Sequence, residues 1–162
     1  MVGGYNRYCN LVFGEVTEDK YINDKYNFSL SVPKGWIVNE DIKKVNGIKT
    51  FIPKTEELII ARMTSISNEE RYEYEVDDYS SLTIYSINSN NIGQVVEDMS
   101  NTSGFKSSTK EKIKERDFFV LNYNDNSKMY LVESNDKILE FLVTPTNNNN
   151  YINTLVDSIE FY

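Results

Sequence analysis

Histidine is absent from all 162 residues, and this absence excludes more chemistry than any other feature of the composition. Histidine is the side chain that titrates near neutral pH without special tuning, and it is the commonest transition-metal ligand. Its absence excludes Ser-His-Asp and Cys-His catalysis, zinc hydrolysis and facial-triad iron chemistry. An enzyme built from this chain would have to rely on carboxylate, lysine, tyrosine or Ser–Lys chemistry.

Cysteine and alanine are scarce as well, with one residue of each, Cys9 and Ala61. A lone cysteine excludes an internal disulfide framework and a Cys-rich metal site. The shortage of alanine, beside abundant asparagine, isoleucine and tyrosine, favours strands and turns over long surface helices. We therefore expect no cofactor, no metal site and no catalytic residues.

Long apolar runs are also missing, since no stretch approaches the ~18 apolar residues of a membrane span. The first ten residues lack the apolar core of a secretory signal. Two locations are consistent with this pattern. The protein is cytoplasmic, or it belongs to the cell envelope or the extracellular space and its export segment has been removed.

Acidic residues outnumber basic ones by 25 to 17, giving a net charge of −8. Nucleic acid is therefore not an expected partner, because phosphate neutralisation needs a basic surface. Apolar residues make up 40% and aromatic residues 13% of the chain, which predicts a packed core. We expect one domain over residues 21–162, after a leader, 1–20, that is poorly structured or holds a short strand at 10–16.

The clearest strand pattern covers residues 26–32, where Tyr26, Phe28, Leu30 and Val32 alternate with polar residues. A Pro-Lys-Gly turn follows and leads to Trp36, the only tryptophan. We expect this tryptophan to pack in the core with phenylalanines 28 and 141, and a ligand-binding role is the alternative. Further strands are expected at 21–22, 48–52, 58–66 and 82–87.

Two helices and a β-meander are expected in the second half of the chain. Ile92, Val95, Val96 and Met99 form one helical stripe, capped by asparagine 90 or 91 and closed by glycine 104. Strands at 105–116, 118–123, 128–133 and 138–143 follow, separated by turns at 116–117, 124–127 and 134–136. A second amphipathic helix ends the chain. The prediction is an α+β domain in which both helices cover the inner face of an antiparallel sheet.

This arrangement resembles the PsbP-like fold, a group that includes the photosystem II extrinsic subunit, the Mog-type Ran-binding protein and many small bacterial lipoproteins. The resemblance rests on residues 26–36, the helix at 91–102, the meander and the ending Leu-Val-Asp-Ser-Ile-Glu-Phe. The resemblance implies an α/β/α sandwich fold. It also implies that the protein is a non-catalytic partner of a larger assembly. Many bacterial members of the group are anchored outside the membrane. No functional residue carries over, since the plant subunit's metal and docking residues have no histidine counterpart here. Anchored members use a lipid-modified cysteine after small residues, whereas Cys9 follows Asn-Arg-Tyr.

An acidic-aromatic segment at residues 69–79 carries six acids against one arginine. It is a candidate for docking a basic partner or a small ligand, or for weak binding of a hard cation such as Ca²⁺. The alternative is a solvated acidic loop. The candidate binding residues are Arg71, Tyr72, Tyr74, Asp77, Asp78 and Tyr79.

A basic stripe is predicted on the first strand of the meander, because its cations occupy even positions. If residues 105–116 are extended, these cations share one face and could lie on an anionic bilayer, although nothing else in the chain indicates a membrane surface. The alternative is an edge strand kept soluble by lysines. The stripe consists of Lys106, Lys110, Lys112, Lys114 and Arg116.

The function expected from these features is a non-catalytic accessory domain that contacts an unidentified protein partner, at the bacterial cell envelope. The alternative is a small-ligand or cation-binding module using residues 71–79. The least favoured hypothesis is a carboxylate-only hydrolase. A Ser-x-x-Lys match at residues 107–110 lies on an expected strand and lacks the other boxes of that enzyme family.

Overall fold

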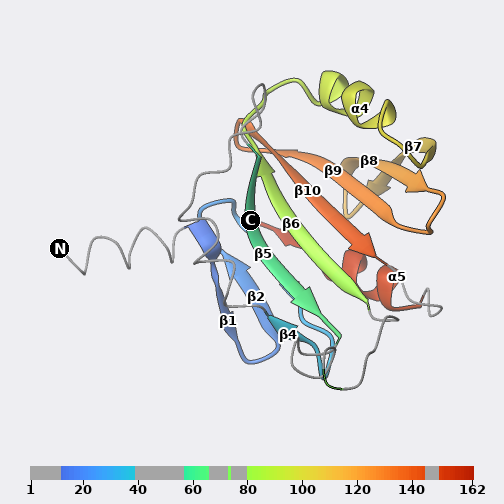
Figure 1. The fold of residues 1–162 in the computed structure, drawn as a ribbon. Coiled ribbons are helices and arrows are strands. Elements are labelled where there is room, and N and C mark those ends of the chain that lie inside the picture. Colours follow the sequence, from blue (N-terminus) through green and yellow to red (C-terminus); the bar gives the residue numbers. More distant parts are fainter. Residues whose placement is uncertain (1–11, 39–56, 66–72, 74–79, 145–149) are drawn as a thin grey trace.

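The computed structural model describes residues 12–38, 57–65, 73, 80–144 and 150–162, which include two antiparallel sheets and two helices of nine and eight residues (Figure 1). The larger sheet has seven strands in the order β4-β5-β6-β10-β9-β8-β7, and the smaller has four in the order β1-β2-β3-β11. The larger sheet contains β4 (Ile37–Val38), β5 (Glu57–Thr64), β6 (Ser81–Ile87), β7 (Phe105–Ile113), β8 (Arg116–Tyr123), β9 (Lys128–Ser134) and β10 (Lys137–Thr144). The smaller sheet contains β1 (Glu15–Thr17), β2 (Lys20–Asn23), β3 (Phe28–Ser31) and β11 (Glu160–Phe161), and the helices are α4 (Ile92–Ser100) and α5 (Asn150–Asp157).

The expected meander is confirmed, because β7, β8, β9 and β10 follow one another in the chain and in the sheet. Its last two strands join at Asn135 and Asp136, whose φ angles of 48° and 62° match a tight hairpin turn. The first hairpin turns earlier than predicted. Its turn residues are Lys114 and Glu115, with φ angles of 47° and 68°, so that Arg116 already belongs to β8 and pairs with Ile113.

Helix α4 begins as the sequence predicts and ends sooner. The side chain of Asn91 accepts a hydrogen bond from the Gln94 N–H at 3.1 Å, which caps the first turn. The helix ends at Ser100. Gly104, expected to close the helix, instead lies in the turn that leads into β7, with φ of 85°.

The two helices lie on opposite faces of the larger sheet, not on one face as expected. Alternate residues of each central strand separate into two cores: Phe118 and Phe141 join the first, whereas Leu121 and Ile138 join the second. The first core is covered by β2, β3 and α5, and the second by α4. The result is a layered arrangement in which α4 covers one face of the large sheet, and the small sheet and α5 cover the other, where β3 contacts α5.

Aromatic packing at the centre of the first core follows the sequence prediction. The rings of Phe28 and Phe141 are fully buried and meet edge to face, with centroids 5.5 Å apart. Trp36 is half-buried and packs against the same core. The first core therefore joins β3 of the small sheet to β10 of the large one.

Residues 12–14, which the sequence assigns to the leader, pack into this first core. Val12 and Phe13 are buried, and Tyr21 Oη donates a hydrogen bond to the Phe13 carbonyl at 2.9 Å. The buried Asn23 side chain donates to the Val12 carbonyl at 2.9 Å. Of the other expected elements, the strand at 48–52 lies outside the described residues. In the described part of the chain, no helix is long and apolar enough to cross a membrane.

Candidate functional site

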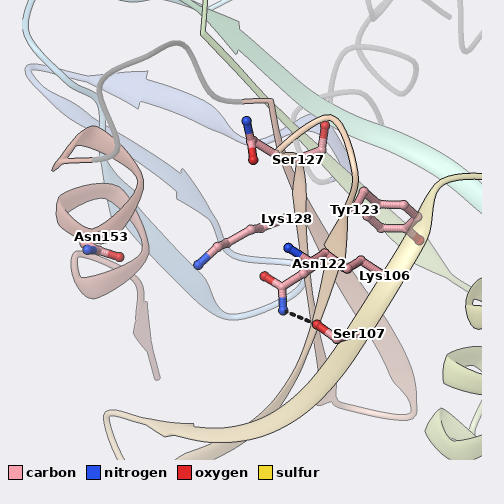
Figure 2. A pocket seen from close by; sticks show the side chains of 8 residues that line it. Lys106, Ser107, Asn122, Tyr123, Ser127, Lys128 and Asn153 are labelled. Carbon is pink, nitrogen blue, oxygen red and sulfur yellow. Dashed lines mark hydrogen bonds between the residues drawn. The ribbon is translucent and has the colours of Figure 1, made fainter.

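A polar hollow of about 360 Å³ opens between the outer strands of the meander and helix α5 (Figure 2). Strands β7, β8 and β9 supply Lys106, Ser107, Asn122, Tyr123 and Lys128. The β8–β9 turn adds Asn126 and Ser127, and α5 adds Asn153. Three consecutive strands of the meander and a helix that comes later in the chain therefore meet around one opening.

Strand register places the hollow on the α5 face of the sheet. Ser107 pairs with Asn122, and Asn122 pairs with Lys128, so these three side chains form one row across the strands. The Asn122 amide donates a hydrogen bond to Ser107 Oγ at 3.3 Å, the contact dashed in Figure 2. The register shifts between Phe105 and Ser107, and Lys106 is the extra residue of this bulge. Bulges redirect side chains, and here the bulged residue lines the hollow.

The β8–β9 turn shapes one wall of the hollow. Asn126 adopts a left-handed conformation, with φ of 67°, and its N–H donates to the Tyr123 carbonyl at 3.1 Å. The Ser127 N–H donates to the Asp125 carboxylate at 2.9 Å, and the hydrogen bonds from Ser127 lower the pKa of that carboxyl. Asp125 is thereby held ionised by its own turn, and it is not part of the lining.

The charge of the hollow is positive. The described residues that line it include two lysines, Lys106 and Lys128, and no carboxylate. In a chain of net charge −8, this arrangement favours a carboxylate or another anionic group and repels a metal cation. Among the described residues, no group of three or more acidic or cysteine side chains that could hold a metal comes together.

A second hollow, of about 450 Å³, lies nearer the β7–β8 turn. Lys110 spans part of its wall, with its ammonium 5.7 Å from the Phe119 ring centroid and 3.9 Å from the Asp117 carboxylate. Both members of this ion pair are more than half exposed, so the pair contributes little to stability. Because Asp117 and Glu133 also line this hollow, its charge is mixed.

The predicted basic stripe is divided between several surroundings. Lys106 lines the first hollow. Lys110 and Lys112 lie opposite Phe119 and Asp117 in the strand register, and these side chains are on the face of the sheet that α4 covers. Lys114 is a turn residue, and its ammonium lies 3.9 Å from the Glu160 carboxylate. Arg116 is half-buried against Phe161. Only Lys110 and Lys112 share one strand face.

The acidic-aromatic candidates, Arg71, Tyr72, Tyr74, Asp77, Asp78 and Tyr79, all lie outside the described residues. The sequence reasoning also missed the lining residues Asn122, Lys128 and Asn153. A signal existed for one of them. Lys128 directly follows the turn signal at 124–127, which places it at the start of a strand. Only the pairing of the strands shows that it lies in line with Asn122 and Ser107.

No protein-family model and no curated protein matches the chain in sequence. Among solved structures, the chain is similar to the solution structure of cyanobacterial PsbP (CyanoP) from Synechocystis sp. PCC 6803. The TM-score is 0.52 and the identity 15%, and the match covers 92% of this chain and 96% of the other. The chain therefore has a PsbP-like α+β fold, as the resemblance in sequence implies.

Proposed function

We propose that this protein is a non-catalytic accessory domain that works by binding another protein. The observation that carries the proposal is the polar hollow beside α5, where Lys106 and Lys128 converge without a lining carboxylate among the described residues. A hollow of about 360 Å³ with two cations is suited to an acidic side chain or a short acidic segment of a partner. The PsbP-like fold supports the same role, because proteins of that group are mostly non-catalytic partners of larger assemblies.

A pull-down from cell-envelope extract tests this function. The wild-type chain should recover a specific partner, and the double variant Lys106→Glu/Lys128→Glu should lose it. The matched control is Lys34→Glu, which reverses the charge of an exposed lysine in the turn after β3. Equal recovery by all three proteins would show that the hollow is not the contact. No specific partner, together with turnover of a substrate by the purified domain, would overturn the proposal.

Location at the cell envelope is the second part of the proposal. It rests on the resemblance to a group whose bacterial members are often anchored outside the membrane. Fractionation of the source cells with an antibody against this chain tests it. Recovery with the envelope or periplasm supports the assignment, and recovery in the cytoplasm refutes it.

Binding of a small anionic ligand is a second candidate function, and the same two lysines favour it. A binding module gains stability in proportion to RT ln(1 + [L]/Kd), so thermal unfolding across a panel of phosphates and organic acids distinguishes the two functions. A rise in Tm that disappears in Lys106→Glu/Lys128→Glu supports ligand binding. The Ca²⁺ hypothesis for residues 71–79 has its own test, since no heat on titration with millimolar Ca²⁺ would end it.

A further inference from the structure

The outer edge of the seven-stranded sheet is formed by β7, and this edge is long. Strand β7 has nine residues, whereas the other outer strands that the structure describes have two or three. All seven side chains from Lys106 to Lys112 are exposed. Long exposed edges are unusual, because they offer unpaired backbone groups to any extended chain.

The backbone groups that face outward on β7 follow from its hairpin. A two-residue turn makes its flanking pair, Ile113 and Arg116, a hydrogen-bonded pair, so alternate residues of β7 bond to β8. Farther along β8, the Tyr123 N–H donates to Ser127, away from β7, which agrees with this alternation. The N–H and C=O groups of Ser108, Lys110 and Lys112 therefore point away from the sheet. Among the described residues, no strand pairs with this side of β7.

The charge of the edge selects the partner. Strand β7 carries three lysines and one glutamate, in a chain whose net charge is −8. A second copy of β7 would bring six lysines together along one new strand pair, and like charges opposite one another are unfavourable. An acidic strand would instead place carboxylates beside Lys110 and Lys112, on the face that these two lysines share.

We propose that β7 is a docking edge that accepts an extended acidic segment of a partner protein as an eighth strand of the large sheet. Main-chain hydrogen bonds to Ser108, Lys110 and Lys112 provide the pairing, and the lysines select an acidic sequence. This inference rests on the proposed function and identifies the kind of partner segment. The edge adjoins the hollow through Lys106 and Ser107, which belong to both.

Amide hydrogen exchange, followed residue by residue by NMR on the full chain, tests the proposal. In the free protein, the amides of Thr109 and Glu111 should be protected and those of Ser108, Lys110 and Lys112 should exchange rapidly. The probe is the peptide acetyl-Glu-Val-Glu-Thr-Glu-Val-Glu-amide, and its matched control has lysine at each glutamate. The acidic peptide should slow exchange at the three outward amides at least about tenfold, and added salt should weaken the effect. The basic peptide should leave them unchanged.

Two variants separate backbone pairing from charge. Lys110→Pro removes an outward N–H and places a ring on the edge, so it should abolish the protection of Ser108 and Lys112. Lys110→Gln keeps the N–H and loses one cation, and we expect it to weaken the peptide affinity only several-fold. If Lys110→Pro does not fold, the exchange pattern of the wild-type chain still decides the question.

Several outcomes would overturn the inference. The first is that both peptides, or neither, protect the three outward amides from exchange. The second is that the wild-type chain sediments as a dimer and that Lys110→Pro converts it to a monomer. Protection by vesicles of anionic phosphatidylglycerol in place of the acidic peptide would assign the edge to a membrane surface instead. A partner recovered equally well by wild type and Lys110→Pro would refute the docking edge and leave the proposed function intact. Recovery of no partner, together with turnover of a substrate by the purified domain, would refute the proposed function itself.

Discussion

The guanidinium carbon of Arg116 lies 4.2 Å from the centroid of the Phe161 ring. Arg116 begins β8 in the seven-stranded sheet, and Phe161 ends β11 in the four-stranded sheet, so this contact joins the two sheets. The Phe161 ring also tilts against Phe118 and Phe28, with centroids 6.1 and 6.4 Å away. A cation thus covers an aromatic cluster at the border between the sheets.

Replacing either partner of this contact should destabilise the fold. In a double-mutant cycle with Arg116→Gln and Phe161→Leu, we expect a coupling free energy of about 0.5–1 kcal/mol, the usual range for a partly exposed cation–π pair. Glutamine keeps a polar side chain with an N–H donor but removes the cation that lies over the ring. Urea unfolding of the four proteins measures the coupling. A coupling of zero would show that Arg116 contributes only its hydrogen bond to the Glu133 carbonyl.

The β7–β8 turn should become more stable when its residues suit its backbone. Lys114 and Glu115 both have positive φ angles, of 47° and 68°, and such angles cost a residue with a Cβ roughly 1 kcal/mol or more. Lys114→Asn together with Glu115→Gly should therefore raise the free energy of unfolding by about 1–2 kcal/mol. The control is Asn135→Gly in the β9–β10 turn, where asparagine already tolerates its φ of 48° and the gain should be smaller. Chemical denaturation compares the two.

Gly14 and Gly35 form a matched pair for separating steric overlap from backbone strain. Both have positive φ, 64° and 85°, but a Cβ on Gly14 would lie 2.5 Å from the Ile22 carbonyl oxygen, whereas a Cβ on Gly35 would meet nothing within 4 Å. Gly35→Ala should cost about 1 kcal/mol and Gly14→Ala about 3 kcal/mol or more. Thermal unfolding measures both. Equal losses would show that residues around position 14 move aside at little cost.

Alkaline pH should destabilise the protein through its buried tyrosines. Burial raises the pKa of Tyr130 to about 12, with the charges of Glu111 and Asp157 adding to the effect, and burial also raises the pKa of Tyr21. Because the folded state favours the neutral phenol, this stabilisation is complete below the ordinary pKa of 10 and is lost as the pH rises toward 12. The free energy of unfolding should fall across that window, and less steeply in Tyr130→Phe. An identical slope in the variant would contradict the assignment.

The sequence by itself determined the elements whose signals are local. Apolar alternation identified β3 and β6, short apolar runs identified β2 and β5, turn signals identified the meander, and an asparagine cap with an apolar stripe identified α4. The asparagine-rich turn signals at 124–127 and 134–136 placed two hairpins correctly. These patterns, with the 26–36 segment and the chain's last residues, also led to the PsbP-like fold.

Tertiary structure alone decided the first hairpin, the faces that the helices cover and the lining of the hollow. The β7–β8 turn uses Lys114 and Glu115, which are poor turn formers, while Arg116 joins β8 and contacts Phe161 at the far end of the chain. An apolar stripe predicts that one face of a helix is buried, but it does not indicate which face of the sheet the helix packs on. The row of Ser107, Asn122 and Lys128 exists because three strands align in one register. Contacts between residues far apart in the chain determine all three features, and no local pattern of residues encodes such contacts.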